Sequence, residues 1–349
     1  MQNRVYFPRT MEILNKILFS LLILCMITSS AVSMTVFQNV SPTIVVDKSS
    51  TSTTIVQIEF PFREDVVEGE ITLGLAPYYG TKKEGSKSTP LFGYSAEEYY
   101  SAIVNDPEQD EMYAKLLGVF DGYAKDHDLT SDEYVELLTT YVQNIPYKTV
   151  GAEVNFPIET VIENKGDCDD KSVLLAGLLA KSGYAAGVVV FSEENHMTAA
   201  IKEEATENVI SQYILIETTR YAYIGENSAL IRSRNRTRIR EDSVFLVGEG
   251  TTAYTASWQI DTILEERDQI ILTIDSLSQE LRVLKNEILS QETLLNQSYD
   301  PVMYENYERN IINYNECMAT CYAYIDELDK INTGSYNREE TYQMVASMM

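Results

Sequence analysis

Basic residues are scarce in this sequence. It has 27 Lys and Arg against 53 Asp and Glu, which gives a formal net charge of -26. So acidic a chain repels phosphate backbones, and nucleic acids are therefore excluded as natural partners. Low-complexity stretches are also lacking, and 44% of the 349 residues are hydrophobic. That is enough for one substantial core and a smaller second module.

Long apolar runs are equally rare, and the longest one that stands out lies near the N-terminus. Basic residues precede the run Ile17–Ile27, and small residues follow it as far as Ser33. This order is typical of a secretory signal, and the run is shorter than the ~20 residues that span a bilayer. We predict a signal peptide over 1–33 and a secreted or cell-surface protein. The alternative is an uncleaved signal that anchors the chain in a membrane.

Cysteine is scarce too, with four in the chain. Cys25 lies in the predicted signal, which leaves Cys168, Cys317 and Cys321 in the mature protein. Exported proteins normally pair their thiols, and three thiols cannot all pair within one chain. Cys317 and Cys321 lie one helical turn apart, where a disulfide is strained and a zinc site lacks ligands. We expect them to pack in a helix seam, with an intermolecular bridge as the alternative.

Hydrophobic periodicity predicts an α+β core. Two runs with a period of two predict an N-terminal β segment over 34–93. Within 94–256, the stretch Cys168–Lys181 has the pattern of a buried helix, apolar nearly all round, with a cap at Gly183. Three β-prone runs follow it. One helix against an antiparallel sheet is the simplest arrangement of these parts.

From Trp258 onward the pattern is that of a coiled coil, with apolar residues at alternating spacings of four and three. The first seam is Ile263, Arg267, Ile270, Ile274, Leu277, Leu281, Leu284, Ile288, Gln291 and Leu295. After the break NQSYDP, the second is Tyr304, Tyr307, Ile311, Tyr314, Met318, Cys321, Ile325 and Leu328. We predict an antiparallel helical hairpin over 257–349 that serves self-association or partner binding.

Cys168 opens the predicted buried helix, where unpaired backbone N–H groups favour the thiolate. Asp167, Asp169 and Asp170 surround it and oppose the thiolate wherever they face the sulfur. Clustered carboxylates can also ligate calcium, and these three acids make a weak calcium signal. Solvated acids at the helix entry are the preferred interpretation, and we expect no other cofactor.

Histidine is the scarcest of the catalytic residue types, with two in the chain. His127 lies in the charged stretch AKDHDLTSDE, which we expect to be solvated surface. His196 opens the β-prone run HMTAAIK, and Glu217 ends the run YILIE. If neighbouring strands bring these two side chains together near Cys168, they form a nucleophile, a base and an orienting acid.

The run GDCDDKSVLLAGLLAKSGY, with NHMTAAI and YILIETTRYAYIGE behind it, resembles the transglutaminase-like superfamily of papain-type cysteine enzymes, in particular its secreted prokaryotic members. The resemblance covers roughly Thr130–Glu226. It implies a papain-like transglutaminase core with Cys168 as nucleophile, His196 as general base and Glu217 as orienting acid. Many relatives carry Asp in place of Glu217, and often Trp where Met197 stands.

The resemblance implies acyl transfer at a carboxamide. The thiolate attacks the carbonyl, the backbone N–H of Cys168 helps to stabilise the oxyanion, and imidazolium protonates the leaving amine. Gln143 and Tyr147 are the candidates for a second oxyanion donor. With water as acceptor the chain is a peptidase or amidase acting on proteins or peptides, which is our leading prediction. With an amine as acceptor it is a crosslinking transglutaminase. A non-catalytic surface or adhesion protein that binds through the hairpin is the third alternative.

Overall fold

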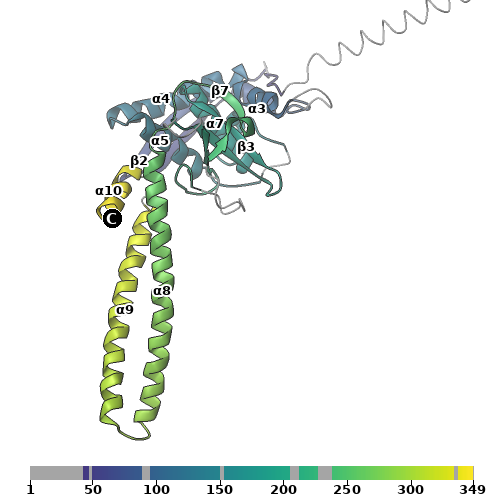
Figure 1. Ribbon diagram of the computed structural model, residues 1–349. Helices are drawn as coiled ribbons and strands as arrows, with labels where there is room; N and C mark the ends of the chain where they lie inside the picture. Colours follow the sequence, from purple (N-terminus) through teal and green to yellow (C-terminus); the bar gives the residue numbers. More distant parts are fainter. Residues whose placement is uncertain are drawn as a thin grey trace, which may run out of the picture.

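The computed structural model of the chain describes residues 42–46, 49–88, 95–149, 153–204, 212–226, 238–333 and 337–348. The predicted signal peptide lies outside these residues. The described residues form an α+β head from which two long helices project side by side (Figure 1). The prediction of a mixed α+β fold with antiparallel strands and a C-terminal helical pair is therefore confirmed.

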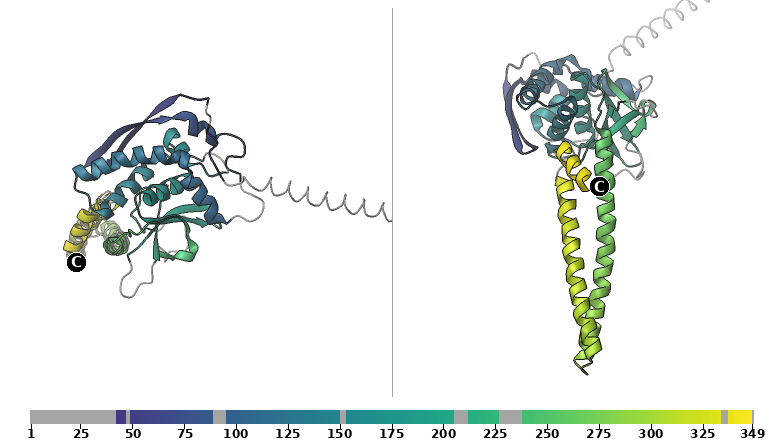
Figure 2. Two further views of the ribbon diagram at one scale, coloured as in Figure 1. Left: turned by 90° about the horizontal axis from the view of Figure 1, so that it is seen from above. Right: turned by 60° about the vertical axis from the view of Figure 1, so that its left-hand side comes forward.

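The N-terminal β segment is a two-stranded antiparallel ribbon, β1 (Thr53–Phe62) and β2 (Asp65–Gly74). Every second residue of β1 is buried, as the period of two predicts. Its buried face packs on the helices beneath it, where the Phe60 ring contacts Phe120 and Tyr141 at centroid distances of 6.1 and 5.5 Å. Figure 2 shows the ribbon lying along one side of the head.

Five helices and a 3-10 turn connect this ribbon to the central helix along the chain. Thr130 caps the helix Ser131–Asn144, as the sequence predicts. Its side chain accepts the N–H of Glu133, and the Glu133 side chain accepts the N–H of Thr130 in return. The elements are α2 (Leu75–Thr81), α3 (Ala96–Asn105), η1 (Pro107–Gln109), α4 (Asp110–Asp126), α5 (Ser131–Asn144) and α6 (Pro157–Glu163).

The central helix is α7 (Cys168–Lys181), and the core of the head surrounds it. Val173, Leu174, Leu175, Ala176, Leu178 and Leu179 are all fully buried. Gly183 takes a φ of +89° directly after the helix, which confirms the predicted left-handed cap. α7 therefore holds its first residue, Cys168, in a fixed position relative to the sheet.

A five-stranded antiparallel sheet covers one side of α7, in the order β6-β5-β4-β3-β7. The three predicted β runs are its central strands, and β7 was not predicted. The strands are β3 (Ala185–Phe191), β4 (His196–Lys202), β5 (Gln212–Ile216), β6 (Arg238–Arg240) and β7 (Phe245–Glu249).

The projecting helices are α8 (Ser257–Leu295) and α9 (Pro301–Thr333), joined at the far end by a short turn (Figure 1). A further helix, α10 (Arg338–Met348), folds back beside the base of α8, within the segment that was predicted as a hairpin of two helices. All ten predicted seam positions of α8 are buried or half-buried. Among the described residues, no helix has an apolar stretch long enough to span a bilayer.

The predicted seam of α9 is wrong at Tyr304 and Ile325. Tyr304 and Ile325 are 42% and 43% exposed, whereas their neighbours Met303 and Tyr324 are half-buried. Adjacent apolar residues satisfy the heptad spacing in either register, so periodicity alone does not separate them. The observed seam is Met303, Tyr307, Asn310, Tyr314, Cys317, Cys321, Tyr324, Leu328 and Ile331.

One continuous hydrophobic cluster runs from Ile44 to Val345 and includes residues of the ribbon, the head and the hairpin base. The three segments predicted between 34 and 349 therefore share a core where they meet. Cys317 and Cys321 are free thiols buried between α8 and α9, as expected for seam residues.

Candidate active site

Cys168 lies at the first position of α7. Asp167 caps the helix, because its side chain accepts hydrogen bonds from the backbone N–H groups of Asp169 and Asp170. It does not accept one from the N–H of Cys168. The segment before the helix is fixed by a backbone bridge between Tyr147 and Gly166. The half-buried thiol and its own N–H thus lie together at a rigid helix entrance.

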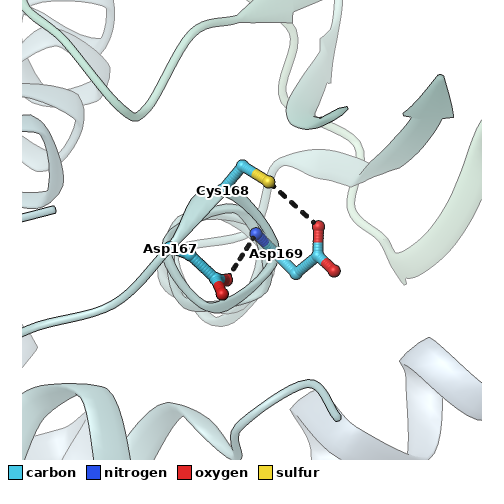
Figure 3. Close-up of side chains that lie close together, drawn as sticks. All are labelled: Asp167, Cys168 and Asp169. Atoms are coloured by element: carbon cyan, nitrogen blue, oxygen red, sulfur yellow. Dashed lines mark hydrogen bonds between the residues drawn. The ribbon is translucent and has the colours of Figure 1, made fainter. Parts of the chain in front are cut away.

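Asp169 faces the sulfur. The S–H of Cys168 donates to Asp169 Oδ1 at 3.3 Å, and Figure 3 shows both side chains on the same side of the helix. Burial, followed by the negative charge of Asp169, raises the pKa of Cys168 to about 12. The backbone N–H of Met197 bonds to the sulfur and acts in the opposite direction. Burial and Asp169 therefore oppose the thiolate character that the helix entrance favours.

His196 and Glu217 form a direct pair. The distance between His196 Nε2 and Glu217 Oε2 is 3.0 Å, and the two residues are 4% and 1% exposed. His196 begins β4 and Glu217 follows the last residue of β5, two antiparallel neighbours, as the sequence predicts. The other carboxylate oxygen of Glu217 accepts the N–H and hydroxyl of Thr219 at 2.7 and 2.6 Å. Both oxygens of Glu217 are therefore held in place.

The strand that carries His196 contacts the thiol through the next residue. Met197, the residue after His196, bonds to Cys168 Sγ through its N–H, and His196 is close enough to Asp169 for an electrostatic interaction between them. Because Glu217 holds Nε2, Nδ1 is the ring nitrogen left for the sulfur. The Ser172 hydroxyl, one turn into α7, donates to Met197 O at 3.2 Å and fixes the strand against the helix.

Lys171 is a site residue that sequence reasoning missed. Its side chain is fully buried, and Nζ donates to the carbonyl oxygens of Gln143 and Ile145 at 3.2 and 2.7 Å, where α5 ends. Burial lowers its pKa to about 8, and the charge of Glu217 opposes that change. The signal available in the sequence was a lysine two residues before the apolar run Val173–Ala180 of the predicted buried helix.

The structure does not place Gln143 as an oxyanion donor. Gln143 Nε2 donates to the carbonyl oxygens of Glu217 and Ala222 at 2.8 and 2.9 Å. An amide has two hydrogens, so both are used. Gln143 instead ties the segment that follows β5 to α5, and this tie supports the position of Glu217.

Three tyrosines lie near the thiol or near Asp169. Tyr147 is 55% exposed, and burial followed by the charge of Cys168 raises its pKa. Tyr99 and Tyr100 on α3 are half-buried; burial raises each pKa to about 12, and Asp169 contributes. All three phenols therefore keep their protons and can donate hydrogen bonds. Tyr147 remains a candidate donor, whereas Tyr99 and Tyr100 were not anticipated.

Calcium fits this cluster poorly. Asp167, Cys168 and Asp169 have ligand atoms within 4.8 Å of one another, but Asp170 is not part of the group. Its carboxylate accepts the backbone N–H and side-chain amide of Asn155 at 2.8 and 2.9 Å. Two carboxylates and a soft sulfur are far from the six to eight oxygen ligands that calcium prefers.

No protein-family model matches the chain, and no curated protein or solved structure is significantly similar to it. The resemblance to the transglutaminase-like superfamily therefore stays a prediction that depends on the motif residues.

Proposed function

We propose that the chain is a transglutaminase-like cysteine enzyme with a papain-like core, and that it hydrolyses amide bonds in a protein or peptide substrate. The observation that supports this is the buried pair of His196 and Glu217, held at the ends of adjacent strands beside the helix entrance that carries Cys168. A buried histidine with a carboxylate on one nitrogen is oriented to accept a proton on the other.

The reaction begins when the Cys168 S–H turns from Asp169 to His196 Nδ1. The imidazole takes the proton, Glu217 stabilises the imidazolium, and the sulfur attacks the carbonyl carbon. The N–H of Cys168 and the hydroxyl of Tyr147 stabilise the oxyanion. The imidazolium then protonates the leaving amine, and a water deprotonated by His196 hydrolyses the thioester and restores the thiol.

Peptide-library cleavage tests this proposal. The wild type is expected to release defined peptides, and Cys168→Ala to release none. Glu217→Asp, which keeps the charge, should retain part of the activity, whereas Glu217→Gln should lose about 10²- to 10⁴-fold in kcat/KM, because an amide cannot hold the same tautomer. Cleavage by Cys168→Ala equal to that of the wild type would exclude the mechanism.

Supplying a primary amine in the same assay distinguishes hydrolysis from crosslinking. We expect free carboxylate products in its presence. Incorporation of the amine, lost in Cys168→Ala, would assign the chain as a transglutaminase instead. Sequencing the N-terminus of the secreted protein tests the proposed export and cleavage after Ser33.

A non-catalytic scaffold is the second candidate, and the raised pKa of Cys168 favours it. An enzyme of this class gains from a thiol that ionises readily, and Asp169 opposes ionisation here. The scaffold hypothesis predicts that Cys168→Ala keeps full biological activity and that a shortened hairpin loses it. Both results together would favour the scaffold over the enzyme.

A further inference from the structure

The two flanks of the hairpin differ in chemistry. Each helix of a coiled coil presents residues on either side of its seam, and in an antiparallel pair like flanks meet. Contact between Cys317 Sγ and Leu277 O, 3.7 Å apart, sets the register and brings Ile325 within one turn of Ile271 across the pair. We name this side the apolar flank: Ile271 and Leu289 on α8, and Tyr304, Ile311, Met318, Tyr322 and Ile325 on α9.

Five of the seven residues of the apolar flank are exposed, and Ile311 and Met318 are half-buried. Ile271 and Ile325 are 40% and 43% exposed, Leu289 is 50% exposed and Tyr322 is 64% exposed. Tyr304, Ile311, Met318 and Ile325 recur every seven residues, so they form one stripe about 32 Å long at 1.5 Å per residue. Apolar stripes of this size on a soluble protein mark binding surfaces.

The opposite flank is mainly polar. Asn310 donates from the seam to Glu287 and Gln291 at 3.1 and 3.2 Å. Asn and Thr occupy most of the equivalent α9 positions, and Glu most of those on α8: Glu266, Glu280, Glu287, Asn306, Asn313 and Thr320. The apolar flank therefore carries more exposed apolar side chains than the opposite one, where Val283, Leu294 and Val302 are exposed among polar residues.

Charge selects the occupant of the apolar flank. The residues that border it or interrupt it include five acids and two bases: Asp268, Asp275, Glu292, Glu308, Asp329, Arg282 and Lys285. A second copy of the chain would bring the same acidic excess, and an anionic lipid surface would be repelled. A heptad stripe 32 Å long matches a helix of about 21 residues. We propose that the apolar flank binds an amphipathic helix with a cationic rim, supplied by a partner protein.

The base of the hairpin keeps this surface in a fixed orientation. Arg238 on β6 pairs with Asp261 on α8 at 2.6 Å, and the Tyr223 hydroxyl donates to Ile331 O at 2.8 Å. A partner helix on the flank is thus held at a fixed angle to the head. This inference is independent of the proposed catalysis.

Binding of two synthetic 21-residue helical peptides to the full chain tests the proposal. Both peptides carry Leu at the heptad positions that would face the apolar flank. One has Lys at the positions on either side of these leucines, and the other has Glu there. By fluorescence anisotropy we expect the Lys peptide to bind at least tenfold more tightly, with an affinity that falls as salt rises. Ile271→Asn combined with Ile325→Asn should weaken it at least tenfold, without changing the charge.

Val283→Asn combined with Val302→Asn is the matched control, since these valines are 56% and 68% exposed and lie on the other flank. It should bind the Lys peptide as the wild type does, as should Cys168→Ala. The proposal is overturned if the two peptides bind equally well or if the Lys peptide does not bind. It is also overturned if the valine control weakens binding as much as the isoleucine variant does. A wild-type dimer that Ile325→Asn splits overturns it too and assigns the flank to a second copy. Sedimentation with phosphatidylcholine vesicles that depends on Ile325 assigns it to a lipid surface.

Discussion

At Cys168 two electrostatic effects compete, and their magnitudes decide the outcome. A helix N-terminus stabilises a nearby anion by about 0.3–1 kcal/mol. Burial, followed by Asp169, raises the pKa of Cys168 to about 12, and a rise of a single unit already corresponds to about 1.4 kcal/mol. The helix entrance alone therefore cannot hold a thiolate, and ionisation requires His196 or a change at Asp169.

Replacing Asp169 tests this balance. Asp169→Asn keeps the size of the side chain and removes the charge, so we expect the pKa of Cys168 to fall. At a fixed pH below that pKa, a fall of one unit raises the thiolate fraction, and with it the rate of iodoacetamide labelling, about tenfold. The rate is measured across pH 6–10 by mass spectrometry. Asp126→Asn, on the exposed surface of α4, is the control. An unchanged profile in Asp169→Asn would contradict the assignment.

Asp170 gives the stability of the fold a specific dependence on pH. Burial raises its pKa to about 6, from 3.8 in the absence of burial, so the native state holds the proton more tightly than the unfolded chain does. Its contribution is complete below pH ~4 and is lost as pH rises through 6, by about 3 kcal/mol in total. We expect the free energy of unfolding of the wild type, minus that of Asp170→Asn, to fall over this range in urea titrations. A constant difference between pH 4 and 7 would show that Asp170 has an ordinary pKa.

At the scale of elements, the segment after β5 is held in place by α5. Gln143 provides this tie through its bonds to Glu217 O and Ala222 O. Gln143→Ala leaves two buried carbonyl groups without that donor, at a cost of about 1–3 kcal/mol each in unfolding free energy.

Tyr147→Phe, at an exposed position, should leave stability unchanged and lower kcat by about tenfold or more. Urea unfolding and steady-state kinetics on both variants distinguish the roles. If Gln143→Ala has the stability of the wild type and a lower kcat, Gln143 acts as an oxyanion donor after all.

Local signals predicted most elements because local physics determines them. The Thr130 cap and the Gly183 turn depend on residues within one helical turn, and β1 depends on alternation along one strand. The His196 and Glu217 pair also followed from order along the chain, since adjacent strands of a sheet bring their ends together. No local signal separates Met303 from Tyr304 as the seam residue, because both satisfy the heptad spacing. Lys171 and Gln143 acquire their roles from distant carbonyl groups, which periodicity does not report.

At the scale of the whole molecule, a buried charge pair joins the C-terminal helix to the head. Glu136 on α5 is 8% exposed and accepts bonds from Arg338 on α10 and from the Tyr254 hydroxyl. Arg338 also bonds to Gln259 at the base of α8. These contacts link α5, α8 and α10, so the hairpin base and the helix that supports the candidate site are one structural unit.

Removing Arg338 should therefore destabilise the whole chain. Arg338→Met leaves Glu136 buried without its cation, which costs about 3–5 kcal/mol of unfolding free energy. Burial already raises the pKa of Glu136, so a lower pH protonates it more easily and the loss should be smaller at pH 5 than at pH 8. Adding Glu136→Gln to Arg338→Met should recover most of the loss, because no buried charge remains and Tyr254 keeps an acceptor. Urea unfolding of the wild type, both single variants and the double variant at the two pH values measures the coupling. A double variant as unstable as the sum of the two single ones would mean that the pair contributes through packing and not through charge.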